Sequence, residues 1–572
     1  MSEIAARMPA IAPAKAPRAA PIVSERQAAG LMIAAIAGVL VLIIALPLWA
    51  LLSKSAQNTD GQFVGLANFL AYAGNPTLMA SLVNSVWVSG LATAIVIPLA
   101  FGFAYALTRS CAPLKGALYA AALLPIFAPS LLAGLSLIYL FGNQGLLKSW
   151  MMGRSLYGPI GIVMAEALYT FPHALLILTT ALSLSDGRLR EAADAMGTSR
   201  ARIFWTITLP GARYGLISAA FVVFTLVITD FGIPKVIGGQ FDVLATDAYR
   251  QVVGQQNFPM GAVVGIVLLV PAIAAFFVDR RAQKRQTALL SARAVPYRPK
   301  PDRRRDLGLF AFAGLIALLI VATYGVAAWG SFVRYWPYNL SLTLANYDFA
   351  NVEPTGWDGY FNSLKLAGLT ALVGAPLVFV GAYLIEKIRV FPRLRGFAHF
   401  LAMLPMAVPG LVLGLGYVFF FNASWNPLNV FYGTLTVLVI NTVAHYFTVA
   451  HITALTSLKQ LDPEFEAVAA SLKVPFWRTF SRVTAPICMP AILDIAVYLF
   501  VNAMTTVSAV IFLYGADTKL ASIAIVHMDE AGAVASAAAM ATVIMATAIG
   551  VKILHVVLTW LVFGRLQKWR ER

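Results

Sequence analysis

Three acidic residues lie within long apolar stretches of this sequence: Glu166, Asp230 and Asp494. An ionised side chain at the centre of a bilayer costs roughly 2.5 to 3.5 kcal/mol on insertion scales, so acids in such stretches usually face protein or water rather than lipid. In those places a carboxylate serves as a proton site or contacts a polar solute. We therefore predict that Glu166 and Asp230 line a path through the protein.

Asp230 is the most informative of the three because of the residues that follow it. Gly232 and Pro234 are predicted to break the helix there and to leave backbone groups facing a cavity. We expect this segment, with Lys235, to shape a gate or a transient substrate contact. The alternative for Asp230 is a helix-end cap or an internal partner for Lys235. The corresponding region of the second half contributes Thr505, Thr506 and Ser508.

The sequence lacks the patterns that catalysis or a resident metal would need. His445 and His451 are spaced so that they do not share a helical face. No nucleophile, base and orienting group stand at a useful spacing. No Gly-x-x-x-x-Gly-Lys-Ser/Thr loop is present to hold the phosphates of ATP. We predict no enzymatic activity, no metal site and no cofactor bound by this chain.

The composition requires a membrane. Of the 572 residues, 60% are apolar and only 12% are charged, which cannot be arranged around the core of an aqueous domain. Apolar stretches of roughly 20 residues, the length that a helix needs to cross the hydrocarbon layer, recur about twelve times. We predict an all-α integral membrane protein with spans near residues 30–52, 84–107, 117–140, 157–182, 213–235, 259–279, 308–331, 362–385, 397–421, 429–455, 489–514 and 535–563.

Lys and Arg near span ends stay on the cytoplasmic side, which orients the bundle with both termini in the cytoplasm. The net charge of +17 is mostly this orientation signal, and nothing in it indicates nucleic acid. The densest run of Lys and Arg lies between residues 280 and 305, and its alternative role is a contact with lipid headgroups or a regulatory contact. The predicted divisions are a disordered cytoplasmic tail (1–26), a first half (27–280), a basic cytoplasmic linker (281–306) and a second half (307–572).

The two halves repeat each other in sequence. Asn84-Ser85, Pro98 and Tyr105 recur as Asn362-Ser363, Pro376 and Tyr383, and Leu124-Pro125, Pro129 and Gly134 recur as Leu404-Pro405, Pro409 and Gly414. With about six spans per copy, each copy returns the chain to its starting side. The copies are therefore predicted to be parallel, related by a pseudo-twofold axis along the membrane normal, with a translocation path between them.

One short loop also occurs in both halves. Ala makes a slim, well-formed helix there, Gly stops it, and Glu near its start favours the positive helix end. Two such loops at equivalent places on one side of a membrane are predicted to be docking points for a soluble partner. The first copy contains Glu191, Ala192, Ala193 and Gly197 and is followed by Pro210; the second contains Glu466, Ala467, Ala469 and Lys473 and is followed by Pro486.

This repeated loop resembles the Glu-Ala-Ala…Gly loop of binding-protein-dependent ABC importer permeases. The resemblance implies the type I ABC importer permease fold, and it assigns both loops to short coupling helices that enter a groove on an ATPase subunit. The second loop departs from the pattern, because Lys473 stands at the place that matches Gly197 and Glu466 lies one position early. That copy is expected to dock with a different geometry.

The fused, two-half form resembles permeases for ferric iron and 2-aminoethylphosphonate, and the strings at 140–147, 229–239 and 503–513 favour the second. The resemblance implies two copies of a separate ATPase subunit, which hold ATP and Mg, a periplasmic substrate-binding protein, and the bacterial inner membrane. The predicted function is import of a small polar solute, 2-aminoethylphosphonate first, by alternating access. Alternatives are a ferric-iron or polyamine permease and, in another class, a secondary transporter driven by an ion gradient.

Overall fold

Apolar helices make up most of the molecule because a helix satisfies its own backbone polar groups in lipid. The computed structural model describes residues 25–183, 187–289, 297 and 299–566; the predicted tail (1–26) falls almost entirely outside them. The first half contains α1 (Glu25–Leu40), α2 (Leu46–Ser55), α3 (Ala67–Ala73), α4 (Pro76–Arg109), α5 (Lys115–Ala122), α6 (Ser130–Phe141), α7 (Pro159–Ser183), α8 (Gly187–Ala195), α9 (Arg200–Ile203), α10 (Leu209–Gly211), α11 (Arg213–Thr229), α12 (Gly232–Ile237), α13 (Leu244–Tyr249) and α14 (Phe258–Leu289).

The second half follows the same order, with a short antiparallel hairpin added after its first helix. It contains α15 (Arg303–Ser331), β1 (Val333–Tyr335), β2 (Asn339–Leu342), α16 (Asp358–Glu386), α17 (Pro392–Met403), α18 (Gly410–Phe421), α19 (Leu435–Lys459), α20 (Glu464–Ser471), α21 (Phe476–Thr479), α22 (Ala485–Ile487), α23 (Met489–Thr505), α24 (Ala521–Glu530) and α25 (Val534–Leu566).

Among the described residues, eight helices are long and apolar enough to cross a membrane, or up to eleven if each of three bent pairs is one span. The sequence predicted about twelve. The difference arises in the third predicted span of the first half, where Pro125 and Pro129 separate α5 from α6 and leave α6 as a shorter apolar helix. Its counterpart, α17 with α18, bends by 115°. Proline lacks an N–H and clashes with the preceding turn, so it ends the helix at these points.

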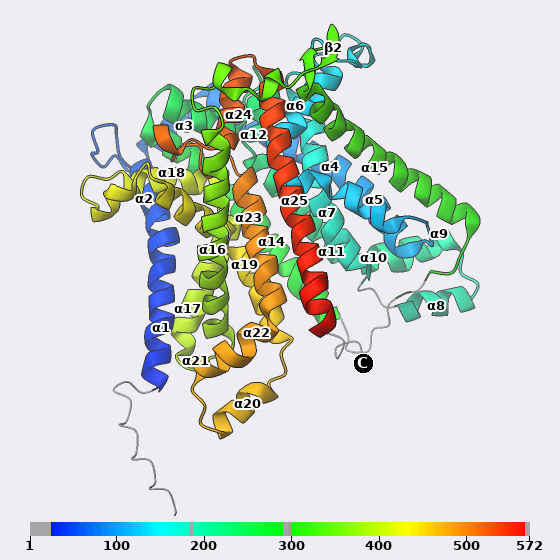
Figure 1. Cartoon of the computed structure of the whole chain (residues 1–572), viewed down its shortest axis with the longest axis vertical. Coiled ribbons are helices and arrows are strands. Elements are labelled where there is room, and N and C mark those ends of the chain that lie inside the picture. Colours follow the sequence, from blue (N-terminus) through cyan, green and yellow to red (C-terminus); the bar gives the residue numbers. More distant parts are fainter. Residues whose placement is uncertain (1–24, 184–186, 290–296, 298, 567–572) are drawn as a thin grey trace, which may run out of the picture.

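The two halves are parallel, as predicted. The helices α8 and α20 lie at the same end of the molecule, and β2 and α24 lie at the other end (Figure 1). We call the end that carries α8 and α20 the loop face, and the end that carries α24 the opposite face. The same order of elements in each half thus runs in the same direction through the bundle.

The first helix of each half packs against the other half. In the first half, α1 and α2 pack against α17 and α18, and the Tyr417 hydroxyl donates a hydrogen bond to the Ile43 carbonyl at 2.7 Å. Conversely, α15 packs against α4, α5 and α6. Glycines permit this close approach: a β-carbon at Gly416 would lie 2.6 Å from the Pro47 carbonyl oxygen, and one at Gly330 would lie 2.7 Å from the Tyr139 ring. The halves are therefore interlocked.

Candidate coupling loops and translocation path

The first predicted loop forms α8 and ends at a left-handed glycine. Gly197 has φ +70°, where a β-carbon is disfavoured. Its N–H donates to the Asp194 carbonyl at 3.1 Å, and the N–H of Thr198 donates to the Ala193 carbonyl at 3.0 Å. These bonds satisfy carbonyls that the end of the helix would leave open. The glycine predicted to stop the helix does so.

The second loop ends in the same way although its residue is not glycine. Lys473 has φ +53°. Its N–H donates to the Ala470 carbonyl at 3.1 Å, and the N–H of Val474 donates to the Ala469 carbonyl at 2.9 Å. Each residue matches its counterpart in the first loop by the offset that places Pro486 on Pro210. The backbone geometry is therefore shared, and how each loop docks stays a prediction.

Both loops expose apolar side chains at equivalent positions. Leu189 and Met196 are 62% and 76% exposed, and their counterparts Phe465 and Leu472 are 44% and 69% exposed. No residue of α20 is buried. Large apolar side chains gathered on short surface helices are typical of a protein interaction site. This arrangement fits the predicted docking role.

The predicted loop residues differ in their surroundings. Glu191 and Ala192 are exposed on α8, whereas Ala193 is buried. In the second loop Glu466 forms an ion pair of 2.9 Å with Lys387, which follows α16. The remaining alanines of the second set, Ala467 and Ala469, are exposed and half-buried respectively. The acid of the first loop is thus open to a partner, and that of the second is tied to a transmembrane helix.

A bent helix connects each loop to the centre of the bundle. Pro210 lies in α10 and Pro486 in α22, at the start of the short helix that precedes the bend. The bend into α11 measures 62° and the bend into α23 measures 74°. Each loop is therefore joined to the end of α11 or α23 by one continuous, bent segment.

Acidic residues at the start of the exchanged helices hold these segments from across the halves. Asp302, which caps α15, forms an ion pair of 2.6 Å with Arg200 at the start of α9. Glu25, the first residue of α1, accepts a hydrogen bond of 2.8 Å from the Phe476 N–H at the start of α21. Residues 200 and 476 are equivalent by the Pro210 to Pro486 offset. Each half thus holds the loop segment of the other.

The linker contributes a contact to the first loop. The ring of Tyr297 lies 4.6 Å from the Arg190 guanidinium of α8 and 4.9 Å from that of Arg109 at the end of α4. Cation–π contacts of this kind contribute about 0.5 to 1 kcal/mol at exposed sites and more where water is excluded. Much of the predicted linker lies outside the described residues.

At the inner end of the bent segments the helix breaks as predicted. α11 ends at Thr229, Asp230 is extended with φ −70° and ψ 133°, and α12 begins at Gly232. The other half breaks identically after Thr505, since Thr506 has φ −67° and ψ 137°. Asp230 Oδ2 accepts a hydrogen bond of 2.7 Å from the Ile233 N–H. This hydrogen bond fits the alternative role that the sequence left open for Asp230, a helix-end cap.

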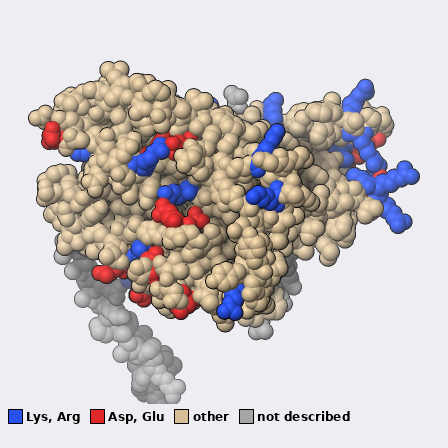
Figure 2. Space-filling view, turned by 90° about the horizontal axis from the view of Figure 1, so that it is seen from above, with Lys and Arg blue, Asp and Glu red and all other residues tan. Residues whose placement is uncertain are grey.

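Lys235 pairs not with Asp230 but across the two halves. Its Nζ lies 2.6 Å from Glu530 Oε1 at the end of α24 and 5.0 Å from the centre of the Tyr249 ring. Tyr249 in turn stacks on Phe512 of the second half, with the ring centres 6.1 Å apart. Figure 2 shows positive and negative groups side by side near the middle of the opposite face. These contacts close the interface between the halves at that face.

Burial also changes the pKa of an acidic residue at this interface. Asp529, next to Glu530, has its pKa raised to about 6, first by burial and then by the neighbouring Glu530 carboxylate. In the second half Lys519 forms an ion pair of 2.7 Å with the buried Glu353. Sequence reasoning missed Glu530 and Asp529, although an acidic pair directly after the apolar stretch 521–528 was a signal that could have found them.

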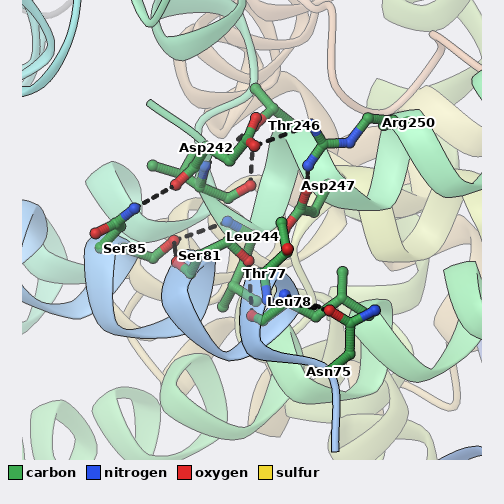
Figure 3. A network of polar contacts seen from close by, with 12 residues as sticks. Asn75, Thr77, Leu78, Ser81, Ser85, Asp242, Leu244, Thr246, Asp247 and Arg250 are labelled. Carbon is green, nitrogen blue, oxygen red and sulfur yellow. Dashed lines mark hydrogen bonds and ion pairs between the residues drawn. The ribbon is translucent and has the colours of Figure 1, made fainter. Parts of the chain in front are cut away.

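A polar network anchors the gate segment of the first half to α4 (Figure 3). Asn84 donates to the Asp242 carbonyl at 3.0 Å, and the Ser85 hydroxyl accepts from the Leu244 N–H at 2.8 Å. The second half repeats it: Asn362 donates to the Asp517 carbonyl at 2.9 Å, and Ser363 accepts from the Ala521 N–H at 2.9 Å. The repeated Asn-Ser pairs therefore fix equivalent segments in the two halves, residues 242–244 and 517–521.

The other predicted path residues lie deeper. Glu166 is fully buried in α7. Thr505 and Ser508 are half-buried, Thr506 is buried, and the Thr506 carbonyl accepts a hydrogen bond of 2.6 Å from Ser522. Asp494, by contrast, pairs with His555 at 3.5 Å within the second half.

Comparison with known proteins places these features in a family. Residues 96–288 and 377–563 each match the family of binding-protein-dependent transport system inner membrane components. The chain is 30% identical to the "Putative ferric transport system permease protein FbpB 1" of Haemophilus influenzae, over 77% of this chain and 71% of that protein. It is 29% identical to the ferric transport system permease protein FbpB of Actinobacillus pleuropneumoniae, over 83% and 70%.

A single half also has shorter relatives. The molybdenum transport system permease protein ModB of Mycobacterium tuberculosis is 24% identical over 43% of this chain and 89% of its own length. Members of the family work with a separate ATPase subunit and a periplasmic binding protein, and the permease itself is not the enzyme. The matched pair of loops, the two repeats and the matches over most of the chain agree: the chain belongs to the binding-protein-dependent transport system inner membrane components and is a multi-pass ABC importer permease.

Proposed function

We propose that this permease imports ferric iron from the periplasm to the cytoplasm by alternating access. The support comes from the two relatives that match most of the chain, both of which are ferric transport permeases by name. The single structural observation that carries the transport cycle is the pairing of exposed loops at one face with the Lys235–Glu530 closure at the other.

The cycle follows from this arrangement. The loop face lies in the cytoplasm, together with both termini, and two copies of the ATPase subunit dock there, one under α8 and one under α20. ATP and Mg are held by those subunits and not by this chain. ATP binding closes the ATPase dimer, and the bent segments carry that motion to α11 and α23, which opens the opposite face toward the periplasmic binding protein. Hydrolysis returns the closed state.

A second candidate substrate is 2-aminoethylphosphonate. The strings at 140–147, 229–239 and 503–513, which resemble permeases for that compound, favour it. Two of these strings contain the helix breaks at Asp230 and Thr506, so they belong to the proposed path. The bacterial inner membrane is the proposed location for either substrate.

The test is reconstitution of the chain with its ATPase and binding protein in liposomes. ATP hydrolysis and uptake are measured with the binding protein loaded with ferric iron or with 2-aminoethylphosphonate. Stimulation by the ferric-loaded protein alone supports the proposal, and stimulation by the phosphonate-loaded protein alone replaces it with the second candidate. Uptake that survives vanadate and collapses with a protonophore would instead identify a secondary transporter.

A further inference from the structure

A groove with a volume of about 420 Å³ lies between the end of α2, from the first half, and the end of α18, from the second. Both helices lie near the left edge of the bundle in Figure 1, away from α12 and α24, which carry the Lys235–Glu530 closure. We call it the aromatic groove. The side chains that characterise it are Trp49, Ser53, Lys54, Phe419, Asn422 and Trp425.

Aromatic rings form much of this groove, and they pack against one another. The ring of Phe258, at the start of α14, meets that of Phe419 edge to face with the centres 6.2 Å apart. The rings of Phe420 and Trp425 meet in the same way at 6.1 Å. Edge-to-face pairs stabilise one another beyond the area that they bury. The chain therefore builds the apolar lining of the groove by itself.

The groove lies at the depth where lipid headgroups meet acyl chains. The candidate span that contains α2 ends at Ser55, and Lys54 directly precedes that residue. Trp49 lies about 7 to 8 Å deeper in the membrane than Lys54 by the rise of an α-helix. Trp49 and Trp425 are 68% and 74% exposed. Exposed indole rings at the end of a span are typical of the membrane boundary, so this groove opens toward lipid.

Lys54 gives the groove one positive charge. Its side chain is half-buried, and it takes part in no ion pair among the described residues. None of the described residues that line the groove is acidic. The Gln57 amide donates to Ser53 Oγ at 3.2 Å, which leaves the hydroxyl hydrogen of Ser53 for another acceptor. The groove therefore offers a cation and a donor to an anion.

We propose that the aromatic groove binds one anionic phospholipid from the leaflet at the opposite face. The phosphate pairs with Lys54 and accepts a hydrogen bond from Ser53, and an acyl chain lies along Trp49 and the rings of α18. Lysines near a membrane surface attract anionic lipids, and aromatic rings lie at the level of the headgroups. A zwitterionic lipid fits less well, because its ammonium group would meet no carboxylate among the lining residues.

The bound lipid joins the two halves. Lys54 belongs to the first half and Trp425 to the second, and the groove lies beside the contact between α2 and α18. A lipid that touches both therefore stabilises the packing of the first helix of one half on the other. The site goes beyond the transport function and applies to either candidate substrate.

The test counts the lipids that the complex of permease and ATPase retains, by native mass spectrometry. Phosphatidylglycerol, phosphatidylcholine and soluble glycerol 3-phosphate are titrated separately. We expect the wild type to retain one phosphatidylglycerol in preference to phosphatidylcholine and to retain no glycerol 3-phosphate. Lys54→Gln should lower the affinity for phosphatidylglycerol about fivefold, equivalent to about 1 kcal/mol. Trp425→Ala keeps the charge and should weaken the binding of both lipids.

Lys365→Gln is the matched control. Lys365 is an exposed lysine near the start of α16, at the same face, and it also takes part in no ion pair among the described residues, but it lies outside the groove. This variant should retain phosphatidylglycerol as the wild type does, and association with the ATPase reports folding for every variant. An equal loss in Lys365→Gln and Lys54→Gln would show attraction by general surface charge and would overturn the site.

Two further outcomes would overturn the proposal. Equal retention of phosphatidylcholine and phosphatidylglycerol by the wild type would remove the role of Lys54. Binding of glycerol 3-phosphate as tight as that of the lipid would show that the groove takes a free phosphate and that the aromatic lining contributes nothing. Thermal unfolding gives an independent readout: added phosphatidylglycerol should raise the midpoint of the wild type more than that of Lys54→Gln.

Discussion

The two halves of this permease share their backbone geometry but differ in the charged groups at their centre. The helix breaks after Thr229 and Thr505 have the same backbone geometry, and both loops end in left-handed residues. At the centre, however, the first half carries carboxyl groups at Glu166 and Asp230 where the second carries threonines. Backbone mechanics are therefore duplicated, whereas charge is placed on one side. The duplicated backbone fits the two ATPase subunits proposed above.

The contacts around the loops differ in a similar way. Both loop segments are held by an acid from the other half, and within the described part of the linker the ring of Tyr297 lies beside two arginines of the first half, Arg109 and Arg190. In the second loop, Glu466 is already paired with Lys387. Among the described residues no ion pair is formed by Glu191, so we expect the first loop to present an acid to a docking subunit and the second to present mainly its apolar face.

The largest effect is expected from breaking one loop at a time. Glu191→Arg with Gly197→Asp should lower ATP-driven uptake by at least about tenfold, since a β-carbon at φ +70° costs roughly 1 to 2 kcal/mol in addition to the reversed charge. The matched variant, Glu466→Arg with Lys473→Asp, should lose less in the loop itself because Lys473 already occupies that conformation. Binding of the ATPase to each purified variant measures this. Equal retention of binding by both variants would contradict the coupling role.

The next largest effect is expected from reversing one charge of the Lys235–Glu530 pair. Lys235→Glu should open the opposite face and raise ATP hydrolysis without loaded binding protein about two- to fivefold, since partly exposed ion pairs contribute about 0.2 to 1 kcal/mol. Adding Glu530→Lys should restore the wild-type rate. Arg250→Gln, which breaks two ion pairs within the first half alone, those with Asp242 and Asp247, serves as the control. Failure of the double reversal to rescue would show that the pair does not hold the halves together.

The same closure should depend on pH. Burial raises the pKa of Asp529 from its ordinary value to about 6, so the closed state binds this proton more tightly than an open, hydrated one. The contribution is complete below about pH 4 and is lost as the pH rises through about 6. Spin labels on the two halves should report a severalfold larger closed population at pH 5 than at pH 7. Asp529→Asn should remove this difference, and an unchanged profile would contradict it.

Smaller effects are expected from the acids that hold the loops across the halves. Asp302→Ala removes both an ion pair and the cap of α15. Glu25→Ala removes one hydrogen bond, for about 0.5 to 1.5 kcal/mol. Both should reduce the ATP hydrolysis that loaded binding protein stimulates, with Asp302→Ala the stronger. Glu25→Gln keeps an acceptor oxygen and should resemble wild type; a loss equal to that of Glu25→Ala would point to charge instead.

Lys473→Gly should have the smallest effect. It relieves a left-handed conformation that costs a lysine roughly 1 kcal/mol, but it adds chain entropy to the unfolded state, so a net gain of a few tenths of a kcal/mol is expected. Thermal unfolding in detergent measures it. A loss of stability would mean that the Lys473 side chain makes a contact of its own.

Local patterns in the sequence predicted several of the helix ends and helix breaks. The helix break after Asp230 followed from Gly232 and Pro234, and the end of α8 followed from Gly197. The helices broken at Pro125 and Pro405 were expected to be continuous, because hydropathy measures apolar length and takes no account of the bend that a proline imposes. Lys235 was placed at a gate, but its partner Glu530 was not found, since the pair joins residues far apart in the sequence.

By itself the sequence determined the membrane class, the repeat, the loop helices and the helix breaks, because each depends on the composition and order of neighbouring residues. Only the tertiary structure decided which half receives α1 and α15, which acid crosses to which loop, and which charges close the opposite face. These depend on helix packing between distant segments. Close approach at Gly416 and Gly330 selects one arrangement from several that the same local pattern allows.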